Sequence, residues 1–149
     1  MQRQTGFTLV ELMVVIAILG ILAVSSVPFY QTWQQRAYGS QATLVMKSLV
    51  DGQIMHYLEY NTFFPPDNVP IIIPYEGQGT PSPDNALDRI YEKLKVKISQ
   101  SPRFDYTITN YGEAGVGLTI RAPFRLFKDG GGHSLTALVT KDGQVSYLK

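Results

Sequence analysis

One carboxylate stands alone in the most apolar part of this 149-residue chain. Glu11 is the single charged residue in the run 7–29, which reads FTLVELMVVIAILGILAVSSVPF. A charged side chain at the centre of a membrane helix costs about 2.5–3.5 kcal/mol, and less near the helix end. Because Glu11 lies close to the start of the run, we expect its cost to fall below that figure.

Nothing else in the sequence indicates catalysis or metal binding. The absence of cysteine excludes disulfides, thiolate metal sites and a cysteine nucleophile. His56 and His133 lie far apart, no acidic cluster has the spacing of metal ligands, and no G-x-S-x-G sequence is present. The stretch 129–132, DGGG, is interpreted as a turn because no helix with a phosphate-binding lysine follows it. We therefore predict a protein that is not an enzyme and has no catalytic residue, metal site or cofactor.

The apolar run must be positioned by a membrane or by other helices. As a helix it would be about 34 Å long, enough to cross a hydrocarbon core of about 30 Å. The residues before it, MQRQTG, carry Arg3 and the amino terminus, and positive charge favours the cytoplasmic side. The sequence therefore predicts a single-pass segment with its N-terminus in the cytoplasm and the rest of the chain outside.

Beyond the run, the helical period continues but becomes amphipathic. Pro28 has no N–H to donate to the carbonyl of Val24, so we expect a kink there. Apolar residues then recur at spacings of three and four until Pro65 and Pro66: Ala42, Val45, Met46, Leu49, Val50, Ile54, Tyr57 and Leu58. This apolar stripe requires a partner, and the remainder of the chain can supply it.

That remainder predicts a small head of strands and one short helix. Residues 67–83 are expected to form a loop interrupted by the apolar patch 71–73, and Asp84 to cap a helix from 85 to about 97. A period of two predicts strands at 104–109, 116–120, 134–140 and 144–148, with a tight turn at 141–143. The predicted fold class is α+β: a long N-terminal helix packed on an antiparallel β-meander.

The N-terminal residues resemble the type IV pilin and pseudopilin family. Residues 6–12, Gly-Phe-Thr-Leu-Val-Glu-Leu, are similar to its prepilin processing motif, and Gly20, Pro28 and Tyr30 are placed as in many pilins. The resemblance is close over about residues 5–30 and reaches the head only in architecture. It implies a leader at 1–6, a transmembrane or filament-core helix half at 7–29, and a periplasmic or extracellular pilin head at 30–149.

The resemblance also implies how the N-terminus is processed. A prepilin peptidase would cut between Gly6 and Phe7 and methylate the new amine of Phe7; glycine allows close approach to that bond. Glu11 would then lie about 6 Å along the helix from a positive amine, and could pair with its own amine or a neighbour's. We predict that Glu11 sets the axial register of assembly. The small side chains of Ala17 and Gly20 would let helices pack closely.

The function implied by the resemblance is that of a structural subunit. The chain would polymerise through its N-terminal helix into a type IV pilus-like filament, a helical homo-oligomer serving adhesion, motility or DNA uptake. Its partners would be a prepilin peptidase, an inner-membrane assembly platform and, before assembly, membrane lipid. It would move from the inner membrane to an extracellular pilus or a periplasmic pseudopilus. The net charge of +1 gives no indication of a specific nucleic-acid partner.

Three alternatives require different sequence features. A pseudopilin of a type II secretion system shares the processing motif, but major pseudopilins often carry a Trp-Gly-x-Pro-Tyr stretch and a calcium site, and the single Trp33 stands in no such stretch. A monomeric membrane-anchored binding domain would use residues 7–29 only as an anchor. A secretory signal peptide would be cleaved near 23–25, but the charge of Glu11 in its apolar region opposes that use.

Overall fold

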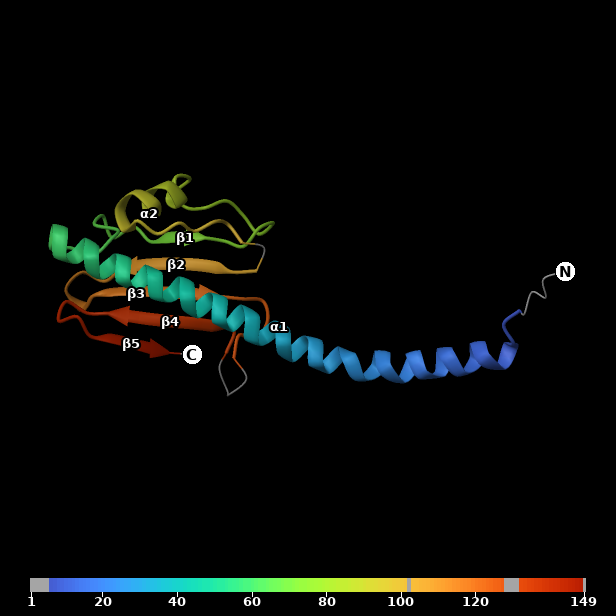
Figure 1. Cartoon of the computed structure of the whole chain (residues 1–149). Helices are drawn as coiled ribbons and strands as arrows, with labels where there is room; N and C mark the ends of the chain where they lie inside the picture. Colours follow the sequence, from blue (N-terminus) through green and yellow to red (C-terminus); the bar gives the residue numbers. More distant parts are fainter. Residues whose placement is uncertain (1–5, 102, 128–131, 149) are drawn as a thin grey trace. The chain divides into compact units, whose positions relative to one another are not determined.

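The computed structural model describes residues 6–101, 103–127 and 132–148 (Figure 1). One helix, α1, extends over Leu9–Tyr60 and continues through Pro28. The chain divides into two compact units, Met1–Gln34 and Gln35–Lys149, and the second is called the head below. The long N-terminal helix predicted from the two apolar patterns is confirmed.

The head contains one antiparallel sheet in which every strand pairs with its neighbour along the chain. The order is β1-β2-β3-β4-β5. The strands are β1 (Ile71–Ile73), β2 (Asp105–Asn110), β3 (Val116–Arg121), β4 (Ser134–Val139) and β5 (Val145–Leu148). A short helix, α2 (Ala86–Leu94), and a 3₁₀ turn, η1 (Gly112–Ala114), complete the head. The α+β meander predicted from the sequence is confirmed.

The head's core lies between one face of the sheet and the second half of α1 (Figure 1). The strands alternate buried and outward residues, as their period of two requires. Within α1 the buried residues are Gly39, Ala42, Met46, Leu49, Val50, Gly52, Gln53 and His56. The predicted apolar stripe therefore holds in its middle but is wrong at Leu58, whose side chain is 75% exposed. Polar Gln53 and His56 take the inner face instead, because the loop after α1 offers them backbone partners.

The structure corrects one local expectation and confirms another. The apolar patch at 71–73 is the edge strand β1, with Ile71 and Ile73 buried and Ile72 outward. A three-residue strand is too short to show a period of two, so the residues around it indicated only a loop. The tight turn at 141–143 is confirmed: Gly143 has φ +75° and its N–H donates to the carbonyl of Thr140 at 3.0 Å. Of the expected turn at 129–132, residues 129–131 lie outside the described residues.

The short helix α2 is shorter than predicted. Asn85, not Asp84, occupies its N-cap position, and no side-chain hydrogen bond caps it. The helix ends at Leu94 because Lys95 adopts a left-handed conformation, φ +58°, and donates its N–H to the carbonyl of Tyr91. The predicted extension to residue 97 is therefore wrong.

Two glycines of α1 allow other parts of the head to approach the helix backbone. A Cβ at Gly39 would lie 2.5 Å from the carbonyl oxygen of Leu126, and one at Gly52 would lie 2.8 Å from that of Leu94. No side chain fits into such contacts. The backbone of the connection after β3 and of the end of α2 therefore lies in direct contact with α1.

Candidate functional site

The predicted processing site lies just before α1. Gly6 and Phe7 are exposed and precede the helix, and the ring of Phe7 is 82% exposed. A Cβ at Gly6 would meet no atom within 4 Å. The bond between them is therefore sterically open, while its cleavage stays a prediction.

Glu11 is held by Thr8 at the first turn of α1. One carboxylate oxygen, Oε2, accepts the Thr8 backbone N–H at 2.9 Å and the Thr8 hydroxyl at 2.8 Å. In return the Glu11 N–H donates to Thr8 Oγ1 at 3.3 Å. This is the reciprocal capping arrangement of a Thr-x-x-Glu sequence. It provides Glu11 with two donors of its own, so the carboxylate is partly compensated even before any amine approaches.

The apolar half of α1 has no cover within its own unit. Its large apolar side chains from Leu9 to Phe29 are 44% to 78% exposed. Ala17, Gly20 and Pro28 belong to this surface, and a Cβ at Gly20 would meet nothing within 4 Å. Among the described residues, α1 is the one helix long and apolar enough to cross a membrane. An apolar surface of this extent requires lipid or other helices around it. The packing roles of Ala17 and Gly20 and the kink at Pro28 stay predictions.

The end of α1 in the head is fastened by buried amides. Gln53 donates from Nε2 to the Phe64 carbonyl at 2.7 Å and accepts the Phe64 N–H at 3.0 Å. Asn110 donates from Nδ2 to the carbonyls of Phe63 and Pro65, both at 2.9 Å. His56 donates from Nδ1 to the Thr62 carbonyl at 2.9 Å, the tautomer that this acceptor requires. These contacts fix the loop that follows the helix.

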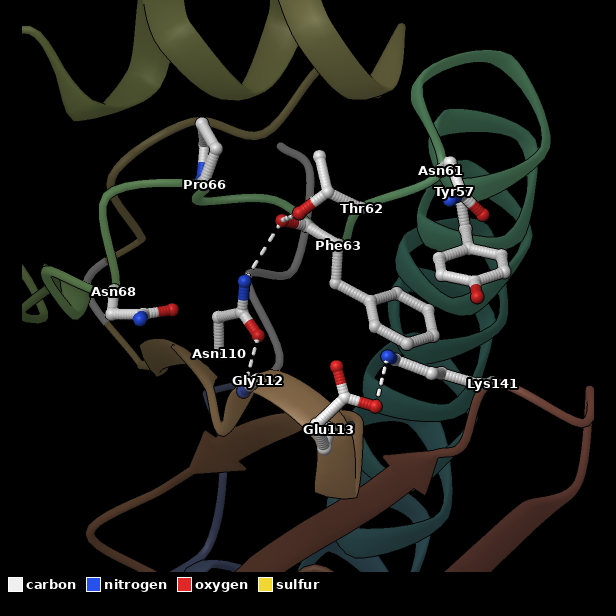
Figure 2. A pocket seen from close by; sticks show the side chains of 10 residues that line it. All are labelled: Tyr57, Asn61, Thr62, Phe63, Pro66, Asn68, Asn110, Gly112, Glu113 and Lys141. Atoms are coloured by element: carbon white, nitrogen blue, oxygen red, sulfur yellow. Dashed lines mark hydrogen bonds and ion pairs between the residues drawn. The ribbon is translucent and has the colours of Figure 1, made fainter.

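A polar pocket of about 200 Å³ opens beside this loop (Figure 2). Ten residues line it: Tyr57, Asn61, Thr62, Phe63, Pro66, Asn68, Asn110, Gly112, Glu113 and Lys141. An ion pair between Glu113 and Lys141 joins two of its walls, and the hydrogen bond from Lys141 to Glu113 raises the pKa of that lysine. Apart from this ion pair, the polar side chains of the lining are hydroxyls and amides.

The two histidines take no part in a common site. His56 is buried against the rings of Tyr60 and Phe64, whereas His133 is exposed before β4. In the part of the chain that the structure describes, no three His, Asp or Glu side chains converge as metal ligands would.

Sequence reasoning missed the role of Thr8 as a helix cap. The signal was present, since a threonine three residues before a glutamate at the start of an apolar helix is a capping signature. The polar anchors Gln53 and Asn110 had no comparable signal, because their partners are backbone groups 11 and 45 to 47 residues away.

Comparison with known proteins finds a similar N-terminal segment in other proteins. A family model described as the prokaryotic N-terminal methylation motif matches residues 1–27. The type IV major pilin PilE of Neisseria gonorrhoeae is 45% identical over 65 residues, which cover 44% of this chain and 38% of that protein. A fimbrial protein of Neisseria meningitidis serogroup B is 46% identical over 57 residues, 38% of this chain and 34% of its own. The type IV major pilin PilA of Myxococcus xanthus is 39% identical over 61 residues, 41% and 28% respectively.

An N-terminal helix with an apolar first half, packed through its second half on an antiparallel meander, defines the pilin-like class of α+β proteins. The family model and the pilin relatives match part of this chain, and its sequence and fold resemble those of type IV pilins. The matched segments span only about a third of the lengths of these pilins.

Proposed function

We propose that this chain is the structural subunit of a type IV pilus-like filament. The observation that carries the proposal is the apolar half of α1, which is exposed along its whole length and begins at the Thr8–Glu11 cap. In a filament, identical helices would cover one another's apolar surfaces, and the heads would form the outside. The relatives named as pilins and fimbrial proteins support the same role.

Assembly would begin with processing at the membrane. A prepilin peptidase removes residues 1–6 and methylates the amine of Phe7, and the subunit waits in the inner membrane with its N-terminus in the cytoplasm. An assembly platform then passes it into the filament. The open backbone at Gly6 and the apolar helix that follows support this sequence of events.

Glu11 would set the register between neighbouring subunits. The cap leaves Glu11 Oε1 without a described partner, whereas Oε2 is already held by Thr8. A Phe7 amine of a neighbouring subunit can therefore pair with Oε1 while the cap stays intact. In an apolar bundle a shifted neighbour would leave both charges unpaired, which is far more costly than in water. Only one axial position would therefore pair the Glu11 carboxylate of every subunit with the Phe7 amine of a neighbour.

Two measurements on one preparation test the proposal. Surface filaments are sheared from cells and probed for the chain, and the mass of the recovered protein is measured. We expect it in the sheared fraction, beginning at methylated Phe7. A chain that stays with the membranes would support the anchored monomer instead. A chain that begins at Ser26 would support a secretory signal peptide.

A further inference from the structure

Four arginines lie on segments at the end of the head where α1 enters it, with Arg121 on the face of the sheet that points away from α1. Arg36 is in the first turn of α1 within the head, Arg103 lies just before β2, Arg121 ends β3, and Arg125 follows in the connection to β4. All four are exposed. They are called the arginine end below. Because neighbouring strands of a meander run in opposite directions, the start of β2 and the end of β3 lie side by side at the same end of the sheet (Figure 1).

Contacts with α1 hold these segments together. The guanidinium of Arg103 lies over the ring of Tyr38, 4.6 Å from its centre. The Leu126 carbonyl, next to Arg125, rests against Gly39, as the lack of room for a Cβ shows. The four side chains therefore come from three parts of the chain that pack on one another.

The positive charge of the arginine end is not balanced by ion pairs. Within the described residues, the ion pairs are Arg89–Asp67 and Glu113–Lys141, and neither includes one of the four arginines. Asp105 is the register partner of Arg121, but one of its oxygens accepts the Tyr75 N–H at 2.7 Å.

One further carboxylate of the described residues must be counted near this end. Glu76 lies on the adjacent segment, with its N–H bonded to the Ser101 carbonyl. Lys128 and Asp129 carry opposite charges and lie outside the described residues. Among the described residues, four arginines therefore stand against Asp105 and Glu76, which leaves this end positive.

Beside Arg121 the sheet carries an open groove of about 470 Å³. Tyr75, Gln78, Thr107 and Thr119 contribute to its lining. A guanidinium flanked by hydroxyl and amide groups matches the chemistry of a phosphate diester that carries a polar alcohol.

We propose that the arginine end binds the headgroups of anionic phospholipids while the subunit waits in the membrane. This inference rests on the membrane insertion that the proposed function includes. Arg36 follows Phe29, the last residue of the apolar run, by seven positions, and even a fully extended chain would separate them by only about 25 Å. Chain connectivity thus keeps this end of the head near the bilayer surface. Tyr30 and Trp33 lie between them, and aromatic residues of this kind favour the interface.

The consequence is a head that is held to the bilayer by charge as well as by its helix. Each arginine near an anionic surface raises the affinity about fivefold, and salt weakens the effect. Duplex DNA is also polyanionic, but it lacks the tether that keeps lipid close to this end of the head. Binding to DNA is therefore an outcome of the test and not the proposal.

The experiment uses the full chain in vesicles, with one fluorophore on an introduced cysteine, since the protein has none of its own. The label is attached in Pro123→Cys, between Arg121 and Arg125, or in the control Gln144→Cys, on the turn before β5. Quenching by a headgroup-attached quencher is compared in phosphatidylcholine vesicles with and without phosphatidylglycerol. We expect phosphatidylglycerol to increase quenching at position 123 only, and about 1 M salt to abolish the increase.

The charge variants decide whether the arginines are responsible. Arg121→Gln with Arg125→Gln should lower the population bound to phosphatidylglycerol about 25-fold, fivefold for each arginine. Lys93→Gln with Lys97→Gln removes the same charge from exposed positions elsewhere in the head and should change little. Equal thermal unfolding of all variants controls for folding.

Three results would overturn the proposal. The first is quenching that does not change with phosphatidylglycerol, and the second is an equal loss of the bound population in the two double variants. The third is binding of duplex DNA at the arginine end without any effect of phosphatidylglycerol. Failure of the chain to float with pure phosphatidylcholine vesicles would instead contradict the membrane insertion in the proposed function. The lipid comparison is made only on protein that floats, so the two failures are distinguishable.

Discussion

The side-chain amide of Gln53 forms a two-way hydrogen-bond pair with the backbone of Phe64. Both residues are almost completely buried, and they join the last turns of α1 to the loop that follows it. The pair explains how a polar residue can occupy the inner face of an otherwise apolar helix. It also marks where the long helix stops and the head begins to fold back on it.

Replacing Gln53 should therefore destabilise the head. Gln53→Ala leaves a buried N–H and a buried carbonyl of Phe64 without partners, which should lower the free energy of unfolding by about 2–4 kcal/mol. Gln41→Ala, at an exposed position of the same helix, is the matched control. Denaturant unfolding of the full chain in detergent measures both. Equal stability of the two variants would show that the amide pair contributes nothing.

The close contact at Gly39 predicts a change in stability opposite in sign to the change expected from helix propensity. Alanine is favoured over glycine inside a helix by about 1 kcal/mol. Gly39→Ala should nevertheless destabilise the head by about 1–3 kcal/mol, because its Cβ would meet the Leu126 carbonyl at 2.5 Å. Gly20→Ala has open space around it and should leave the unfolding of the head unchanged. A head that unfolds later in Gly39→Ala would refute the close contact.

Tyr106 should make the head unstable in alkali. Burial raises the pKa of its phenol to about 12, above the unfolded value of about 10. Between these values the folded state holds a proton that the unfolded state has lost, so stability falls as pH rises, by about 2–3 kcal/mol in all. Below pH 10 both states are protonated and the effect vanishes. Urea unfolding at several pH values should show this decline in the wild type and a flatter profile in Tyr106→Phe. Tyr111→Phe, at an exposed position, should keep the full decline.

Glu11 should be needed for filaments but not for folding. Glu11→Ala removes the carboxylate that would neutralise a neighbour's amine, so sheared filaments should be lost while processing, insertion and head unfolding remain as in the wild type. Glu59→Ala removes an exposed carboxylate at the other end of α1 and should assemble normally. Immunoblots of sheared and membrane fractions compare the two. Abundant filaments from Glu11→Ala would exclude the register role.

The sequence predicts most of the fold because the long elements carry clear periods. The helix, the meander and the turn at 141–143 were all predicted from apolar spacing and turn residues. β1 was missed because three residues cannot display a period, and the end of α2 was missed because Lys95, a residue with no turn preference, takes a left-handed conformation.

The functional sites also differ in whether a local sequence pattern predicts them. Glu11 could be found from sequence because a lone charge in an apolar run is a local signal. The arginine end could not, since Arg36, Arg103 and Arg121 are separated by long stretches of sequence, and only the meander brings their segments to one end of the head. Local patterns therefore predict the helix and its terminus, while the surface chemistry of the head depends on the tertiary fold.

The pairing of Glu11 with a neighbour's amine is tested most directly in the assembled filament. Filaments are grown from two mixed populations, one with ¹⁵N at the Phe7 amine and the other with ¹³C at the Glu11 carboxylate, so that only contacts between subunits give a signal in solid-state NMR. We expect dipolar coupling that corresponds to a separation of about 4 Å, the range in which opposite charges stabilise each other. Well-ordered filaments without measurable coupling between the two populations would contradict the account.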